Sequence, residues 1–242
     1  MAMKIINYLL FFLVAMPAFL SAQEKVIVND KNAQVRDVGA FSAIAVSGSI
    51  DLYLSPDDHQ VVVVSARDES LRDRIITRVN GSTLEILFNN KGVGIKSDMR
   101  LKAYVSFKQL NKLTASGSSD VFVNGVIKSD KLGVHINGSS DFNGALDVNQ
   151  LDLHQTGSSD SKISGRVGVV KVHLSGASDM KAFDLSTEVC EVDASGASDV
   201  SVTVSKELYV HVSGASDVRY KGKGIVKESR TSGASSIKWV ED

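Results

Sequence analysis

Four of the five histidines in this 242-residue sequence occupy the same position relative to a short repeated phrase. The phrase is a glycine between small residues, closed by an aspartate, as in SGASD at residues 175–179. Imidazoles that share one row of a sheet can bind a transition metal or contact a ligand, and they can equally form a polar face without a ligand. Three residues before the successive glycines, the chain carries Thr114, His135, His154, His173, Asp193, His211 and Arg230.

Small polar residues stand one position before the same glycines, and they would flank the histidines on a strand. Their hydroxyl and amide groups can donate and accept hydrogen bonds, as a ligand-contact surface requires. We call the combined set the polar strip, and the sequence leaves open whether it holds a metal. It consists of His135, His154, His173, Asp193, His211, Asn137, Thr156 and Ser175.

The aspartates that close the phrase form a second row, the corner row: Asp120, Asp141, Asp160, Asp179, Asp199 and Asp217. Carboxylates stacked at the spacing of β-strands, about 4.8 Å, repel by about 1 kcal/mol per neighbouring pair in water. Hydrogen bonds from backbone N–H groups and adjacent serines can offset this repulsion, and so can calcium ions that bridge neighbouring repeats. The phrase lacks the nonapeptide spacing of calcium-binding β-rolls, so we interpret the row as mainly structural, with no cofactor and with calcium as the alternative.

The glycines of the phrase define the elements that must position both rows. They are Gly117, Gly138, Gly157, Gly176, Gly196, Gly214 and Gly233, so the steps are 21, 19, 19, 20, 18 and 19 residues. Segments between them alternate with period two, as in KLGVHI and VVKVHL, and a period near 19 is too short for helical-pair repeats. We therefore predict an all-β fold, a parallel β-helix (solenoid) with coils of about 19 residues.

Residues in the same phase of each coil predict the core. The phrase between the inward rows is a corner, where glycine adopts a backbone conformation that is costly for other residues. The single cysteine, Cys190, falls where neighbouring repeats carry Leu or Val, and we predict a small buried hydrophobe. The inward rows are Leu113, Val134, Leu153, Val172, Val192, Val210 and Ser229 before the glycines, and Val121, Phe142, Ser161, Met180, Val200 and Val218 after the aspartates.

The N-terminus predicts export. Residues 1–22 contain Lys4 as their one charge, the apolar run YLLFFLVAMPAFL, and a small pair ending at Ala22, as a cleaved signal peptide does. The predicted mature N-terminus is Gln23 rather than a cysteine that could carry lipid, and no later segment could span a membrane. We expect a protein of the periplasm, the outer surface or the medium that is not a lipoprotein. Residues 23–39 form an N-terminal lead-in, and residues 40–242 form one domain, with irregular coils over 40–100 and regular coils over 101–240.

The segments FSAIAVSGSIDLYL and RIITRVNGSTLEILF, with the serial SGSSDV and SGASDV phrases, resemble the family of "putative autotransporter adhesins, head GIN domain", which is common in the envelope of Bacteroidetes. The resemblance covers about residues 40–240. It implies a right-handed parallel β-helix, a cell-envelope location and an adhesin-like role, and it implies no catalytic residues.

The favoured function is therefore a non-enzymatic, adhesin-like binding module that contacts a glycan or another surface protein through its polar rows. The net charge of −1 gives no electrostatic argument for nucleic acid as a partner. One alternative is a carbohydrate-active β-helix enzyme of the lyase or hydrolase type, for which Asp193 between His173 and His211 is the nearest candidate group. Another is a purely structural envelope scaffold. Polar residues recur on every coil instead of gathering on a few, which disfavours the enzyme.

Overall fold

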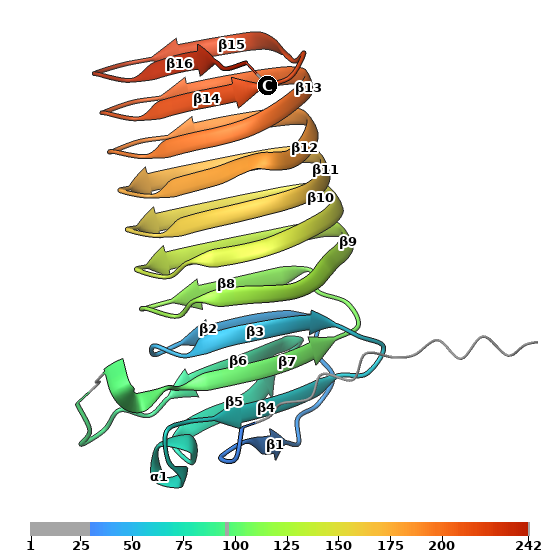
Figure 1. Cartoon of the computed structure of the whole chain (residues 1–242), viewed down its shortest axis with the longest axis vertical. Coiled ribbons are helices and arrows are strands. Elements are labelled where there is room, and N and C mark those ends of the chain that lie inside the picture. Colours follow the sequence, from blue (N-terminus) through green and yellow to red (C-terminus); the bar gives the residue numbers. More distant parts are fainter. Residues whose placement is uncertain (1–29, 95–96, 242) are drawn as a thin grey trace, which may run out of the picture.

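The computed structural model describes residues 30–94 and 97–241, and it shows an almost entirely β chain wound into a flattened stack of coils (Figure 1). The predicted signal peptide and the first part of the lead-in lie outside the described residues. The strands form one continuous sheet of 16 strands. The predicted all-β solenoid is confirmed, with about seven turns at a spacing of about 19 residues.

Each regular coil is one long strand that bends in its middle and ends at a glycine–aspartate corner. Neighbouring strands pair in parallel and in phase, so that Leu153 lies between Val134 and Val172. In the strand that contains Leu153, burial alternates through the middle of the strand except at Asn149 and Gln150, which are both exposed. The long strands bend around the stack (Figure 1). The long strands are β9 (Val121–Gly138), β10 (Phe142–Gly157), β11 (Asp160–Gly176), β12 (Asp179–Ala194) and β13 (Asp199–Val212).

The bend gives every coil two faces. We call the half before the corner glycine the histidine face, and the half after the corner aspartate the opposite face. Both predicted inward rows are buried, from Leu113 to Val210 and from Val121 to Val218. Ser229 is the exception: it is exposed in the last coil, because none of the described strands stacks above it.

Two further core predictions can be checked directly. Cys190 is fully buried, and burial raises the pKa of its thiol to about 12, so it packs as a hydrophobe. Ser161 is buried as predicted, and its hydroxyl donates to Gln155 Oε1 at 2.5 Å. The Gln155 side-chain amide in turn donates to the carbonyl oxygen of Ser159 at 2.7 Å. Both buried side chains therefore have hydrogen-bond partners inside the protein.

The corner glycines are required by geometry. Gly176 has a φ of +89°, a region that favours glycine. A Cβ atom at this position would overlap the carbonyl oxygen of Gly157 in the preceding coil. The same overlap recurs along the stack, so that each corner fits only when its glycine lies directly on the glycine of the coil before.

The N-terminal third does not stack in chain order. Strands β2 (Ala43–Ser47) and β3 (Asp51–Pro56) form a coil that pairs on one side with β8 (Lys112–Ser116) and β9. On the other side this coil pairs with β6 (Thr83–Phe88) and β7 (Lys102–Phe107), which come later in the sequence. The coil of β2 and β3 therefore lies between the coil of β6 and β7, which is nearer the base, and the coil that begins with β8 (Figure 1).

Antiparallel strands close the base of the stack. Strand β4 (Val61–Ser65) pairs antiparallel with β7, β1 (Gln34–Arg36) pairs antiparallel with β4, and β5 (Ile75–Asn80) pairs antiparallel with β6. The short helix α1 (Glu69–Arg72) begins at Asp68, whose carboxylate accepts the N–H of Leu71. A 3-10 turn, η1 (Ser97–Met99), precedes β7.

The other end of the stack is formed by shorter strands. They are β14 (Asp217–Lys221), β15 (Ile225–Thr231) and β16 (Ser236–Trp239), and they continue the parallel pairing of β13. Trp239 lies beside Tyr220, and its indole N–H donates to the carbonyl oxygen of Gly222 at 3.2 Å. Among the helices described, none has the length and apolar character needed to span a membrane.

Candidate functional site

The corner row is tied into the backbone of the stack. From Asp120 to Asp199, the Oδ1 atom of each aspartate accepts the backbone N–H of the aspartate one coil further on. The distance is 3.0 Å from the Asp160 nitrogen to Asp141 Oδ1, and 3.3 Å from the Asp179 nitrogen to Asp160 Oδ1. The row ends at Ser236, whose hydroxyl donates to Asp217 Oδ1 at 2.6 Å and lowers the pKa of that carboxyl. Backbone donors therefore offset the repulsion between stacked carboxylates.

Basic side chains from the opposite face contact the second carboxylate oxygen of some of these aspartates. Lys181 Nζ lies 3.3 Å from Asp160 Oδ2, and a guanidinium nitrogen of Arg219 lies 3.3 Å from Asp199 Oδ2. Both oxygens of these two aspartates are thus engaged by protein groups. These contacts favour the structural interpretation of the corner row over the calcium alternative.

The corner serines act differently from the expectation that they bond the adjacent aspartates. Their hydroxyl oxygens accept the backbone N–H of the serine in the preceding coil, at 3.0 Å from the Ser119 nitrogen to Ser140 and 3.2 Å from the Ser198 nitrogen to Ser216. The serine hydroxyl points into the stack, whereas the aspartate lies on its rim, and this is why the two do not meet. The fully buried members are Ser119, Ser140, Ser159, Ser178, Ser198 and Ser216.

Asp51 on β3 extends the corner row toward the base, because the next residue, Leu52, pairs with Val121, the residue after Asp120. This end of the row is the less favourable environment for charged carboxylates. Burial, followed by the charge of Asp120, raises the pKa of Asp51. Burial also raises the pKa of Asp120, although the N–H of Asp141 bonds its carboxylate. These two carboxyls therefore carry an unfavourable charge at neutral pH, unlike Asp217 at the other end.

The histidines of the polar strip form a stack on the histidine face. The rings of His135 and His154 are nearly parallel, with centroids 4.8 Å apart, and those of His154 and His173 lie 4.6 Å apart at 25°. The in-phase pairing of β9, β10 and β11 produces this arrangement, because it places the three residues side by side. Partial burial, then the nearby His154 and Lys112, lowers the pKa of His135 and favours its neutral form.

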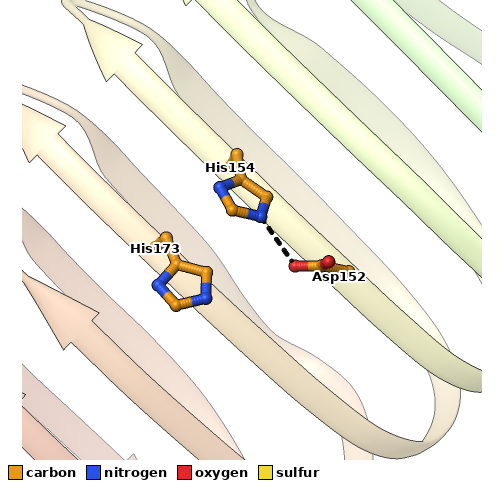
Figure 2. Close-up of side chains that lie close together, drawn as sticks. All are labelled: Asp152, His154 and His173. Carbon is orange, nitrogen blue, oxygen red and sulfur yellow. Dashed lines mark ion pairs between the residues drawn. The ribbon is translucent and has the colours of Figure 1, made fainter.

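Asp152 completes this cluster, and sequence reasoning missed it. It lies two residues before His154 on β10, so both side chains point outward from the same face. Its Oδ1 atom is 2.9 Å from His154 Nε2 (Figure 2). Its own row carries Lys112, Gly133, Lys171, Glu191 and Tyr209 at the neighbouring coils, so no repeated letter marked the position. Its position two residues before His154 was the one sequence signal that could have placed the two side chains on the same face of the strand.

The remaining acidic and basic members of the strip do not join the cluster. Asp193 lies in register between His173 and His211, as predicted. No hydrogen bond or ion pair joins Asp193 to either histidine in the part of the chain that the structure describes. His211 Nε2 lies 3.3 Å from Glu228 Oε1 without an aligned hydrogen bond. The three residues suggested for an enzyme, His173, Asp193 and His211, are thus adjacent in register but are not joined by hydrogen bonds among the described residues.

The small polar members flank the histidines on the side nearest the corner. Thr156 Oγ1 donates to Asn137 Oδ1 at 2.8 Å, and Ser175 lies beside Thr156 in register. Thr156 is exposed, and the other two are partly exposed. The strip therefore presents imidazole, hydroxyl and amide groups on one outward surface.

A separate cleft of about 470 Å³ lies near the base. It is bounded by residues that flank β2, β3, β4 and β7, and it contains the fifth histidine, His59, whose Nδ1 is 3.4 Å from Asp57 Oδ1. The Gln60 side chain there bonds both backbone groups of Phe41 and so has a structural role. The lining residues are Phe41, Ser42, Asp58, His59, Gln60, Lys108 and Gln109.

Comparisons with known proteins agree with this architecture. A family model described as "Putative auto-transporter adhesin, head GIN domain" matches residues 40–224. Among curated proteins, none matches the chain significantly.

Several solved structures share the fold at low sequence identity. A "putative adhesin" from Bacteroides fragilis has a TM-score of 0.80 at 19% identity, covering 86% of this chain and 96% of its own. A "putative adhesin" from Parabacteroides merdae has a TM-score of 0.69 at 17% identity, covering 86% and 95%. A "putative lipid binding protein" from Parabacteroides distasonis has a TM-score of 0.67 at 21% identity, covering 88% and 98%.

Proposed function

The chain belongs to the family described as "Putative auto-transporter adhesin, head GIN domain", and from this premise we propose that it is a non-enzymatic binding module of the cell envelope. In this proposal the polar strip contacts the hydroxyl groups of an extended glycan. Export by the segment predicted at residues 1–22 would bring the module to the periplasm, the outer surface or the medium, without a lipid anchor.

The observation that carries the proposal is the in-register repetition of the polar strip. Asn137, Thr156 and Ser175 lie on adjacent strands, at the strand spacing of about 4.8 Å. Beside them runs the imidazole stack of three histidines. A surface that repeats its donors and acceptors at regular intervals suits a ligand that also repeats, because several weak contacts then form together.

The contrast with the corner row supports the choice of this surface. The corner carboxylates are occupied by backbone N–H groups and by basic side chains. In the part of the chain that the structure describes, the strip side chains make three polar contacts, namely Thr156 with Asn137, His154 with Asp152, and His211 with Glu228. Their hydrogen-bonding capacity is therefore available to a ligand.

A glycan array tests this proposal. The chain from residue 23 to 242 is applied in the presence of a chelator, so that binding does not depend on a metal. We expect binding to extended polysaccharides, and we expect the triple variant Asn137→Ala, Thr156→Ala, Ser175→Ala to bind at least tenfold more weakly.

A matched control lies on the opposite face, where Asn143, Lys162 and Ser201 belong to one outward row. Changing these three to alanine should leave glycan binding unchanged. Equal loss in both triple variants would contradict the assignment to the strip. A chain that binds no glycan, but binds lipid vesicles or purified envelope proteins, would overturn the proposed ligand class.

A further inference from the structure

The structure assigns a divalent transition-metal site, of the kind that takes Zn²⁺, to Asp152, His154 and His173 on the histidine face (Figure 2). This site does not depend on glycan binding by the polar strip. It shares His154 and His173 with the polar strip, adds Asp152, and uses none of the hydroxyl and amide groups of Asn137, Thr156 and Ser175; it is tested by a different measurement.

The donor set is the first argument. Two imidazoles and one carboxylate are ligands typical of zinc sites that keep an open position, whereas calcium and magnesium prefer oxygen ligands alone. The potential ligand atoms of the three residues all lie within 4.8 Å of one another. A tetrahedral ion with bonds of about 2.0–2.1 Å needs ligand atoms about 3.4 Å apart, so no separation has to close by more than about 1.4 Å. Rotation of partly exposed side chains can supply that movement.

The backbone holds these donors in place. Asp152 and His154 are two residues apart on β10, and therefore project from the same face. His173 is the in-register partner of His154 on β11. Their imidazole rings stack at 4.6 Å, and Asp152 Oδ1 already lies 2.9 Å from His154 Nε2. The ligands thus come from two hydrogen-bonded strands of a rigid sheet, so little chain entropy is lost on binding.

The surroundings leave room for the ion. The partner of Asp152 on β9 is Gly133, where an added Cβ would meet the His135 Nε2 atom no closer than 3.7 Å. On the other side, the partner of Asp152 is Lys171, whose ammonium lies 2.9 Å from Glu191 Oε2. The positive charge of this neighbour is therefore paired with a carboxylate.

Calorimetric titration of residues 23–242 with ZnCl₂ tests the site. We expect one Zn²⁺ per chain with a dissociation constant in the micromolar range or tighter, no response to CaCl₂, and a higher melting temperature with zinc. His154→Thr and His173→Thr should each weaken binding at least tenfold, and Asp152→Asn should weaken it by a smaller factor. Threonine is the chosen replacement because Thr114 occupies the same row.

Two histidines outside the cluster provide matched controls. His59→Ala and His211→Thr should leave the zinc affinity within twofold of the original chain. Retention of binding by the His154→Thr, His173→Thr double variant would overturn the site, as would its loss in either control.

A spectroscopic readout keeps the test valid if a variant folds poorly. In the unmodified chain, imidazole ¹⁵N resonances of His154 and His173 should shift on zinc addition, and that of His59 should not. Uniform shifts at all five histidines, or none at the cluster, would contradict the proposal.

Discussion

The corner aspartates and the histidine row, by which we mean the stacked residues His135, His154 and His173, are both columns of one residue type on adjacent coils, yet the protein uses them differently. From Asp120 to Asp199, each corner carboxylate accepts a backbone N–H from the next coil, as Asp160 does from Asp179. The imidazoles of His154 and His173 stack on each other, and among the described residues no backbone N–H donates to either ring. A residue that recurs in the sequence therefore has a known position in the coil. Whether its side chain bonds to the protein backbone or stays available to a ligand shows whether the column stabilises the stack or faces a ligand.

The largest expected effect comes from the corner glycines that hold the aspartates in phase. Gly176→Ala should lower the free energy of unfolding by about 3 kcal/mol or more, because it combines a positive φ with overlap on the Gly157 carbonyl oxygen. Urea denaturation measures the change. Gly81→Ala is the control: φ is +61° there but the space is open, so a loss of about 1 kcal/mol is expected. Equal losses of unfolding free energy at both sites would mean that the contact between Gly176 and Gly157 does not add to the cost of the substitution.

A smaller effect is expected from the corner carboxylates. Asp179→Ala should cost about 1.5 kcal/mol, since it leaves the Asp199 N–H without its side-chain acceptor. Asp179→Asn keeps an acceptor oxygen and should cost less. The melting temperature of the unmodified chain should not fall when calcium is chelated. A chelator effect that disappears in Asp179→Asn would restore the calcium interpretation.

The two ends of the corner row should respond to pH with opposite sign. The pKa of Asp51 is raised, so its carboxyl stabilises the fold below the unfolded value of about 3.9 and loses that contribution as pH rises through the raised pKa. Asp51→Asn should therefore raise the melting temperature at pH 7 and have little effect near pH 3.

Asp217 is the internal control for this pH prediction. Its pKa is lowered by the Ser236 hydroxyl, so its contribution is present above about 3.9 and is lost as pH falls through the lowered pKa. Asp217→Asn should lower the melting temperature at pH 7. Melting temperatures are measured from pH 3 to 7. A change of the same sign in both variants at pH 7 would contradict the opposite pKa shifts of Asp51 and Asp217.

The regular coils could be predicted from the sequence because the period places chemically equivalent residues in one row. Leu153, Phe142 and the corner glycines follow directly from the step of about 19 residues. The pairing of Gln155 with Ser161 did not follow, because it joins two different rows and each residue is unusual in its own row. The role of Asp152 was not predicted for a similar reason. Its residue type differs from those at the same position in neighbouring coils, and only its contact with His154 indicates a role.

The base could not be predicted in detail, because the period fails there. The sequence separates Gly48 from Gly117 by 69 residues, yet β2 and β8 are neighbours in the sheet. The intervening residues supply a coil on the far side of β2 and the antiparallel strands that close the core. Such an insertion is set by long-range strand pairing, which a local pattern of alternating residues does not encode.

The most direct test of the division between supporting and ligand-facing columns is a comparison of two double variants by urea denaturation with a chelator present. Asp160→Ala with Asp179→Ala removes two corner carboxylates, and His154→Thr with His173→Thr removes two stacked imidazoles from the same two coils. The aspartate pair should lose about 3 kcal/mol of unfolding free energy, and the histidine pair less than about 1 kcal/mol. Equal losses, or a larger loss for the histidine pair, would show that the histidine column supports the stack and would contradict its assignment as the ligand-facing surface.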